Sequence, residues 1–574
     1  MSFIKQAFNC FEQGDLISAL RHASLLLKQE PHNIAALNLV GIIKLRSGDV
    51  TEAIDYLSHA YKHSCDKQTM MNLALAYVQA ENFSQATPLL QRVVELTPKD
   101  SNALNALGNI YRINGDYKNA SKYLKRASEL APNNPQVFEN IAWLLLAQGQ
   151  YSSALSRFTA LLKSFPKNSQ LKLGVAKALL KLNKLDEAFE VLQVLTQQSP
   201  KNVEVSNTLG VLYNLQHQTT LAKAQFEKVI CLAPKHSEAL FNLGSIFEQE
   251  GNADQALSFY TKVISVNPLF FDAYFHLSLV NKQSYETEIL TQWQNLWIEN
   301  QDNLSSYMLA FAIGRTLEKN ELYKASFEWF LKGREQLSQF GNYNFEEQNT
   351  LVKQLLAKSS HSKLSKIDLD YSYIFIVGMP RSGTTLTDQI LASHSDVVAI
   401  GESGIVKKMA DKVEAITNQP FYQGVYQLST QEHLSILALL QTSHQHADKK
   451  IIVDSSPMNL HYISFLLTLL PQANFVVCQR SPMDTCLSIF QHPLSKHHSY
   501  ANNLTDLANF YLQTDQLLKH FIKNEPEQVY SLHYESLVTQ PKQQIERLLT
   551  SLNLIWSPIA IEIVKLIPKR LIAL

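Results

Sequence analysis

A strict 34-residue period in the first half of the sequence constrains the fold more than any other feature. Small residues keep the phase of this period, among them Gly108, Ala142, Ala176, Gly210 and Gly244. A proline also recurs at every step, at Pro98, Pro132, Pro166, Pro200, Pro234 and Pro268. In repeat architectures each unit buries its apolar face only by stacking on its neighbours. We therefore expect a helical array in this half of the chain.

One unit, residues 101–134, reads SNALNALGNIYRINGDYKNASKYLKRASELAPNN. It has a small residue where two helices would touch, a turn near Gly-Asp-Tyr, a second small residue and a final proline. This order resembles the tetratricopeptide repeat. The resemblance implies an α-solenoid over residues 1–282 with an extended concave surface. The expected partner is a protein or peptide held on that surface. An array that only supports or oligomerises the second half, as in a homodimer, stays open.

The rest of the chain divides into two parts. Residues 283–366 are predicted to be helical, with a degenerate repeat at 310–337 and a polar linker at 358–366. Residues 367–574 are predicted to be an α/β domain. In that domain, buried strands are expected at 373–377, 397–400, 450–453, 474–478 and 528–533, and helices at 386–392, 459–470, 504–522 and 542–552. Such alternation predicts a parallel sheet flanked by helices, with ligand chemistry at the carboxyl ends of the strands.

Residues 373–385, YIFIVGMPRSGTT, form the first strand-to-helix connection of that domain. Loop amides and a helix N-terminus meet there and favour a phosphate group. Gly378 and Gly383 have the spacing of a Walker A loop, but Thr384 stands where the lysine would be and Arg381 lies inside the loop. This pattern disfavours a kinase or other nucleotide triphosphatase. It favours an anion held by a guanidinium and hydroxyls.

Arg480 follows the strand at 474–478 and precedes a helix, so a second anion is expected one sheet position from the first. A salt bridge from Arg480 to Asp484 is the structural alternative.

The motifs PRSGTT (380–385) and RSPMDTCLS (480–488) together resemble the nucleotide-binding motifs of sulfotransferases. The whole segment 371–557 is similar to tyrosylprotein sulfotransferase. The resemblance implies a three-layer, P-loop-like α/β fold and the co-substrate 3′-phosphoadenosine 5′-phosphosulfate (PAPS). The first motif would bind the 5′-phosphosulfate and the second the 3′-phosphate. The implied nucleotide-binding residues are Arg381, Ser382, Gly383, Thr384, Thr385, Arg480, Ser488 and Tyr534.

Glu402 is the expected general base for the acceptor hydroxyl, because it is an acid at the end of the second strand. The family motif ends in Gly-Glu-Glu, and its second glutamate is the base. Counted from Arg381, Glu402 takes that place; aligned on Gly401, Ser403 does. A helix N-cap role for Glu402 is the structural alternative. Glu402 and Arg381 are thus the expected catalytic residues.

Two departures from the family pattern affect the activity expected. The family carries a lysine after its third-strand aspartate, whereas Ser455 follows Asp454 here. The family also continues into a serine- and basic-rich loop that closes over PAPS. Here an apolar helix is predicted at 559–574, so the domain is expected to be truncated at its C-terminus. The alternative function is a repeat scaffold with a nucleotide-binding but inactive domain.

Composition sets the remaining expectations. Lys+Arg and Asp+Glu balance at 51 each, so nucleic acid is not an expected partner. The cysteines are five and scattered, the first residues do not form a signal peptide, and the apolar runs are too short to span a membrane. A cytoplasmic protein is therefore expected. No metal site is expected, and His492, His497 and His498 are assigned to a solvated loop because no other ligand accompanies them.

Overall fold

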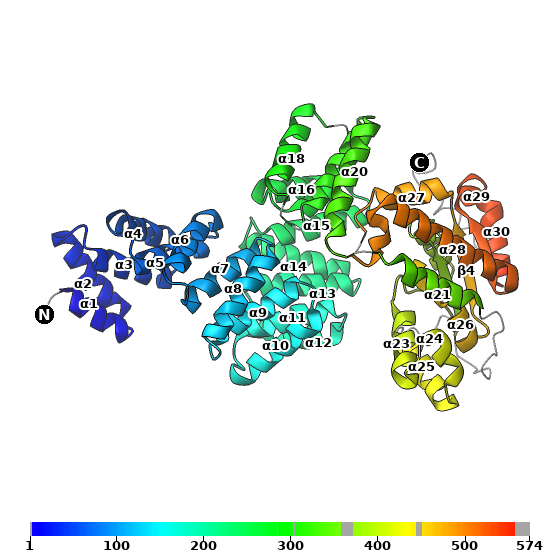
Figure 1. Ribbon diagram of the computed structural model, residues 1–574, viewed down its shortest axis with the longest axis horizontal. Helices are drawn as coiled ribbons and strands as arrows, with labels where there is room; N and C mark the ends of the chain where they lie inside the picture. The colour runs from blue at the N-terminus through cyan, green and yellow to red at the C-terminus, as the bar shows by residue number, and fades with distance from the viewer. Residues whose placement is uncertain are drawn as a thin grey trace. The chain divides into compact units, whose positions relative to one another are not determined.

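The computed structural model describes residues 3–283, 285–301, 303, 305–341, 343–357, 371–442, 450–494 and 496–556. The linker predicted at 358–366 and the helix predicted at 559–574 lie outside these residues. The chain forms two compact units, Met1–Ala312 and Ile313–Leu574, and most of their helices are labelled in Figure 1.

The N-terminal unit is a succession of helix pairs, as the 34-residue period predicted (Figure 1). Its helices are α1 (Phe3–Glu12), α2 (Leu16–Gln29), α3 (Ile34–Ser47), α4 (Val50–His63), α5 (Lys67–Gln79), α6 (Phe83–Leu96), α7 (Ser101–Ile113), α8 (Tyr117–Leu130), α9 (Pro135–Ala147), α10 (Tyr151–Ser164), α11 (Ser169–Lys181), α12 (Leu185–Gln198), α13 (Val203–Leu215), α14 (Thr219–Leu232), α15 (Ser237–Gln249), α16 (Ala253–Val266), α17 (Phe271–Val280) and α18 (Thr287–Glu299).

The helices of a pair approach closely, and this explains the periodic small residues. A Cβ atom added to Gly210 on α13 would lie 2.6 Å from Cε1 of Phe226 on α14. Phe226 itself is fully buried. Because interiors are close-packed, a larger residue at Gly210 would push the two helices apart. The contact recurs at Gly314 and Phe330, sixteen residues apart in the C-terminal unit, where an added Cβ would lie 2.6 Å from the ring.

The C-terminal unit contains a five-stranded parallel sheet in the order β2-β3-β1-β4-β5. Its strands are β1 (Ser372–Gly378), β2 (Val397–Ala399), β3 (Ile451–Asp454), β4 (Asn474–Gln479) and β5 (Val529–His533). All five coincide with predicted strands to within one or two residues. β4 is the direct neighbour of β1, with Gly378 in register with Cys478. Arg480, which directly follows β4, therefore lies one sheet position from the loop that follows β1, as predicted.

Helices pack on both faces of this sheet, which makes the domain three-layered. The helices of this part of the chain are α19 (Tyr307–Lys319), α20 (Tyr323–Ser338), α21 (Phe345–Ala357), α22 (Thr384–Ala392), α23 (Ile405–Thr417), α24 (Phe421–Gly424), α25 (Thr430–Thr442), α26 (Ile463–Leu469), α27 (Pro482–Phe490), α28 (Leu504–Asn524), α29 (Tyr534–Thr539) and α30 (Pro541–Ser551), with 3₁₀ turns η1 (Val425–Gln427), η2 (Pro457–Tyr462) and η3 (Lys496–Asn502).

Strand β1 separates two cores. Tyr373, Phe375 and Val377 pack into one with α23, α25 and α28, while Ile374 and Ile376 pack into the other with α22 and α30. This alternation follows from the two-residue period of a strand. Because both faces are covered, the strand is apolar throughout, as in buried parallel sheets.

One predicted helix differs in detail. Residues 459–470 were expected to form a single α-helix, but the segment begins as the 3₁₀ turn η2 and becomes α-helical only at α26. Asn459 explains the tight start, because its amide Nδ2 donates to Asp454 Oδ1 at 3.0 Å and holds the turn against the end of β3.

Among the described residues, no helix combines the length and the apolar composition needed to cross a bilayer.

Candidate functional site

The loop between β1 and α22 is shaped by backbone conformations that few residues adopt. Gly378 has φ +152°, and a Cβ atom there would lie 2.5 Å from the Cys478 carbonyl oxygen. Arg381 and Gly383 have φ values of +68° and +102°. Left-handed residues on either side of Ser382 turn the loop into a backbone concavity of the kind that binds anions. The first amides of α22 open onto this concavity, since they lack acceptors within the helix.

Two hydroxyl side chains of the loop are turned inward. The Ser382 hydroxyl donates to the Met379 carbonyl at 2.7 Å, and the backbone amide of Ser382 donates to the same oxygen at 3.2 Å. Ser382 and Thr384 are buried, whereas Thr385 is exposed. Thus Ser382 shapes the loop through its own hydrogen bonds, and the exposed loop hydroxyl is that of Thr385.

Five of the predicted residues form one continuous contact network. The Arg381 Nε donates to Ser488 Oγ at 3.1 Å, which joins the motif at 380–385 to the motif at 480–488. The Arg480 Nη1 donates to the Arg381 carbonyl at 3.2 Å. The Arg480 guanidinium lies 4.9 Å from the centre of the Tyr534 ring. That ring packs on Gly383, where a Cβ would lie 2.8 Å from Tyr534 Cδ2. Residues from the loop, β4, α27 and α29 therefore build a single site.

A carboxylate also supports this network. Glu535, the residue after Tyr534, accepts a hydrogen bond from the backbone amide of Ser481 at 2.7 Å. This contact ties the start of α29 to the start of α27. The Arg480 guanidinium contacts Arg381 and the Tyr534 ring, which argues against a simple ion pair with Asp484.

The site carries a concentration of positive charge. Burial and the neighbouring Arg480 lower the pKa of Arg381. Burial and the charges of Arg381, Arg315 and Arg334 lower the pKa of His492 to about 3. His492 is thus neutral and partly buried, and its assignment to a solvated loop was wrong; its Nδ1 donates to the Ser488 carbonyl at 2.9 Å. Closely spaced guanidinium groups repel one another, and a bound polyanion relieves that repulsion.

Two arginines of this cluster had no signal in the sequence. Arg315 on α19 has a buried Nε without a hydrogen-bond partner among the described residues. Burial lowers its pKa, and the charge of Arg381 lowers it further. Arg334 on α20 is buried, and it donates to the carbonyls of Phe490 at 3.0 Å and of Ile489. Arg334 therefore caps the C-terminal end of α27, the helix that carries Ser488.

The predicted base, Glu402, lies near two other carboxylates, Asp388 and Asp454. It follows β2 and is exposed. Partial burial and the charges of Asp454 and Asp388 raise the pKa of Glu402. A carboxylate with a raised pKa is better matched to proton abstraction near neutral pH.

Ser403 and Asp454 hold each other in place beside Glu402. The Ser403 hydroxyl donates to Asp454 Oδ2 and accepts from the Ile405 amide at 3.1 Å. Asp454 Oδ1 accepts from the Ser456 amide at 2.9 Å. Ser403 thus supplies the side-chain hydrogen bond at the start of α23. The N-cap position of α23 is occupied by Gly404, so Glu402 is not the N-cap residue.

Asp388 is an acid that the sequence reading missed. It lies on α22, one turn after Thr384 and Thr385. Burial and the charge of Asp454 raise the pKa of Asp388. Its Oδ1 is buried and has no hydrogen-bond partner among the described residues. The sequence offered one signal for Asp388: it lies three and four residues after Thr385 and Thr384, so a helix places all three residues on one face.

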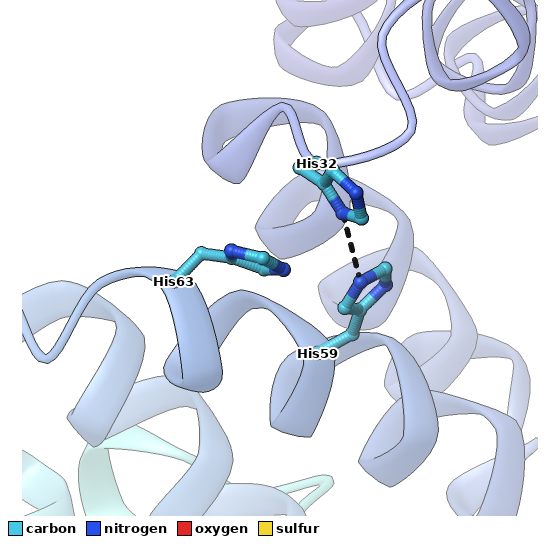
Figure 2. A group of neighbouring side chains, drawn as sticks. All are labelled: His32, His59 and His63. Carbon is cyan, nitrogen blue, oxygen red and sulfur yellow. Dashed lines mark hydrogen bonds between the residues drawn. The ribbon is translucent and has the colours of Figure 1, made fainter.

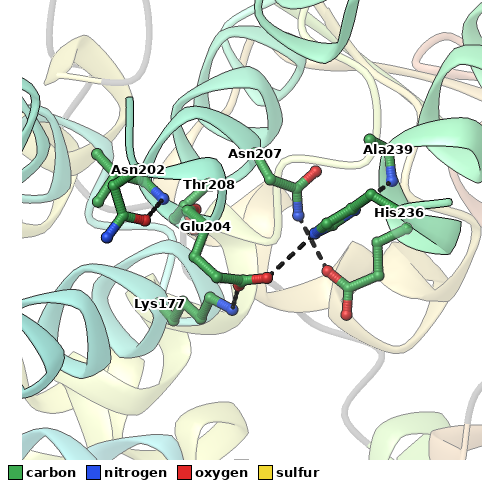
Figure 3. A network of polar contacts seen from close by, with 9 residues as sticks. Lys177, Asn202, Glu204, Asn207, Thr208, His236 and Ala239 are labelled. Carbon is green, nitrogen blue, oxygen red and sulfur yellow. Dashed lines mark hydrogen bonds and ion pairs between the residues drawn. The ribbon is translucent and has the colours of Figure 1, made fainter. Parts of the chain in front are cut away.

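The solenoid carries its own polar network (Figure 3). Lys177 Nζ lies 2.8 Å from Glu204 Oε2, and His236 Nε2 lies 3.1 Å from Glu204 Oε1. His236 and Lys177 lower the pKa of Glu204 to about 2. Asn207 Nδ2 donates to Glu238 Oε2 at 2.9 Å. These residues come from α11, α13 and α15 and from the turn before α15, so they connect consecutive repeats.

This network borders one hollow of the N-terminal unit, and a second hollow lies among the earlier repeats. The first has a volume of about 600 Å³ and is lined by Lys177, Asn207, Glu238 and Phe241, among others. The second, of about 580 Å³, is lined by a group of side-chain amides: Gln68, Asn72, Asn102, Asn105, Asn109, Asn134, Gln136 and Asn140. Side-chain amides offer both donors and acceptors. Such walls are suited to a polypeptide backbone.

Models of known protein families match segments in both halves of the chain. Residues 373–558 match the family model described as Sulfotransferase family. Residues 18–209 and 237–268 match two tetratricopeptide repeat models.

Individual relatives are distant and only partly covered. An uncharacterized protein of Aquifex aeolicus is 27% identical over 275 residues, which is 44% of this chain and 36% of that protein. Protein-tyrosine sulfotransferase 1 of Danio rerio is 23% identical over 210 residues, 35% of this chain and 58% of that protein. Nodulation protein NoeE of Sinorhizobium fredii is 22% identical over 206 residues, 31% of this chain and 49% of that protein. The chain thus spans less than two thirds of the length of each.

Proposed function

We propose that this chain, which carries a sulfotransferase-family domain behind tetratricopeptide repeats, moves a sulfuryl group from PAPS to a hydroxyl group, with protein tyrosine as the expected acceptor. The hydrogen bond from Arg381 to Ser488 is the observation that carries the proposal. It joins two residues 107 positions apart in sequence, one from each motif that resembles a nucleotide-binding motif. A nucleotide with phosphate groups at both ends is the kind of ligand that would use both motifs.

The donor would lie with its phosphosulfate on the loop and its 3′-phosphate on Arg480 and Ser488. The backbone amides of the concavity and the N-terminus of α22 favour the 5′ end. Arg480 offers a planar fork for the 3′-phosphate. Arg381 lies between the two motifs, so its guanidinium can serve both ends. Arg315, with its free buried Nε, adds a further positive charge that we assign to the bound nucleotide.

The transfer itself is an in-line displacement at sulfur. Glu402 takes the proton of the acceptor hydroxyl, the hydroxyl oxygen forms the new bond to sulfur, and the bond from sulfur to the bridging oxygen breaks. The bridging oxygen leaves on adenosine 3′,5′-bisphosphate (PAP). As in phosphoryl transfer, the protein mainly positions the reactants and stabilises charge. With Ser455 where the family has a lysine, Arg381 and the α22 amides are left to stabilise the leaving group.

The repeats would hold the acceptor protein. The amide-lined hollow and the Lys177–Glu204–His236 network support this role, because both offer paired donors and acceptors to an extended peptide. The five cysteines are free thiols, which agrees with a reducing compartment, and we propose a cytoplasmic location.

The experiment is transfer of radiolabelled sulfate from PAPS. The purified chain would be incubated with labelled PAPS and, in parallel, tyrosine-containing peptides, saccharides and small hydroxyl compounds. Label in the peptide fraction, lost in Arg381→Ala, supports the proposal. Label only in saccharides or small molecules keeps the reaction and replaces the acceptor. Tight PAP binding without any transfer supports the inactive scaffold instead.

A further inference from the structure

Three histidines of the first repeats converge on one point (Figure 2). His32 lies in the turn between α2 and α3, and His59 and His63 lie on α4. One ring nitrogen from each lies within 4.8 Å of the others. His32 Nδ1 and His59 Nε2 are 3.1 Å apart.

The spacing suits a tetrahedral metal ion. Zinc–nitrogen bonds of about 2.0–2.1 Å put two ligand nitrogens roughly 3.3 Å apart in a tetrahedron. The separation of His32 and His59 is already close to this value. His59 and His63 are four residues apart on one helix, the spacing of the two histidines in the zinc motif H-E-x-x-H. Here the segment reads HAYKH and lacks the glutamate, so no hydrolytic base accompanies the pair.

The turn that carries His32 is held in place by its neighbours. Asn33 accepts a hydrogen bond from the Ala36 amide at 3.1 Å and so caps α3. The Asn33 amide also donates to Glu30 Oε2 at 2.7 Å. A ligand on a capped turn and two on a helix face need little rearrangement to bind an ion.

The three imidazoles are close enough together to share one ion. Neutral imidazole is the form that binds metals. Protonated rings at these distances would repel one another, whereas an ion shared by three lone pairs removes that repulsion.

We propose that His32, His59 and His63 form a three-imidazole site for a borderline divalent cation, zinc first, with its fourth position open to water or an added ligand. Imidazole ligands suit zinc, copper and nickel rather than magnesium or calcium. The bound ion would link the α2–α3 turn to the last turn of α4 and so brace the first repeats against each other. This inference does not depend on the proposed transfer reaction. Sequence patterns miss the site, because His32 and His59 are 27 residues apart.

The test uses the full chain and zinc chloride in isothermal titration calorimetry, with cobalt(II) as a spectroscopic probe. We expect one zinc ion per chain and a visible cobalt absorption typical of tetrahedral sites. His59→Ala should weaken zinc binding by about tenfold or more, and H59A/H63A should abolish it. Zinc should raise the Tm of the wild-type chain and leave that of H59A/H63A unchanged.

A matched control is His520→Ala, which removes a partly exposed histidine of the C-terminal unit. It should keep zinc binding intact. Circular dichroism would check that each variant retains its helices, and His63→Gln provides a milder second variant. Equal zinc affinity in the wild type and in H59A/H63A, or no zinc binding by the wild type, would overturn the site.

Discussion

Replacing Arg480 with alanine should weaken binding of PAP far more than binding of adenosine 5′-monophosphate (AMP). Only PAP has the 3′-phosphate that Arg480 is proposed to hold. The comparison of two ligands therefore separates the phosphate contact from any general damage to the site.

The magnitude follows from the contacts of Arg480. Its hydrogen bond to the Arg381 carbonyl and its position over Tyr534 support the loop for either ligand. Their loss costs about 1–2 kcal/mol for both nucleotides. The contact with the 3′-phosphate adds charge-assisted hydrogen bonds worth about 1.5–3 kcal/mol each. With about 1.4 kcal/mol per factor of ten, the loss of affinity for PAP should exceed that for AMP by roughly 100-fold.

Isothermal titration calorimetry on wild type and Arg480→Ala with both nucleotides gives the four dissociation constants. Arg480→Lys keeps the charge but not the planar guanidinium, so its affinity for PAP should lie between those of the wild type and Arg480→Ala. If the two nucleotides lost affinity by the same factor, Arg480 would be supporting the loop alone, and the assignment of the 3′-phosphate would be refuted.

Three further predictions concern the loop, the base and the added charge. Gly383→Ala places a Cβ atom 2.8 Å from the Tyr534 ring on a residue with φ +102°. The affinity for PAP should therefore fall by about tenfold or more, while the Tm measured by differential scanning calorimetry changes by only a few degrees. An unchanged affinity would contradict the close packing of Gly383 and Tyr534. Glu402→Gln should lower kcat by about 100-fold or more without changing the PAP dissociation constant. Because the base must be ionised, the wild-type kcat should fall with decreasing pH, with an apparent pKa above the usual 4.5. A wild-type rate that does not depend on pH would exclude Glu402 as the base. Arg315→Met should weaken PAP binding, and it should raise the Tm of the protein without nucleotide because it removes a buried guanidinium. A lower Tm with an unchanged affinity for PAP would show that the role of Arg315 is purely structural.

The elements of the fold that could be predicted depend on local sequence patterns. The repeats follow from a 34-residue period, and the five strands follow from short apolar runs next to polar loop residues. The P-loop-like connection is also local, because Gly378, Arg381 and Gly383 are close in sequence. The 3₁₀ start of η2 was missed, since it depends on the contact between Asn459 and Asp454.

The candidate site was only partly predictable because several contributors come from other elements. Arg315 and Arg334 lie in helices before the α/β sheet, and nothing in their local sequence marks them as neighbours of Arg381. In the sequence, Asp388 cannot be distinguished from other polar residues of an amphipathic helix. Its proximity to Asp454 depends on the pairing of the strands in the sheet. His492 was misassigned for the same reason, because its partial burial depends on the helices packed around it.

The central claim is that one site binds PAPS and passes its sulfuryl group to a hydroxyl. The most direct measurement is a single-turnover reaction with the chain in excess of radiolabelled PAPS and an acceptor peptide present. We predict that PAP and the sulfated peptide form at the same rate and that Glu402→Gln forms neither. Labelled PAPS that stays bound and unchanged, or that yields free sulfate in place of sulfated peptide, would contradict the account.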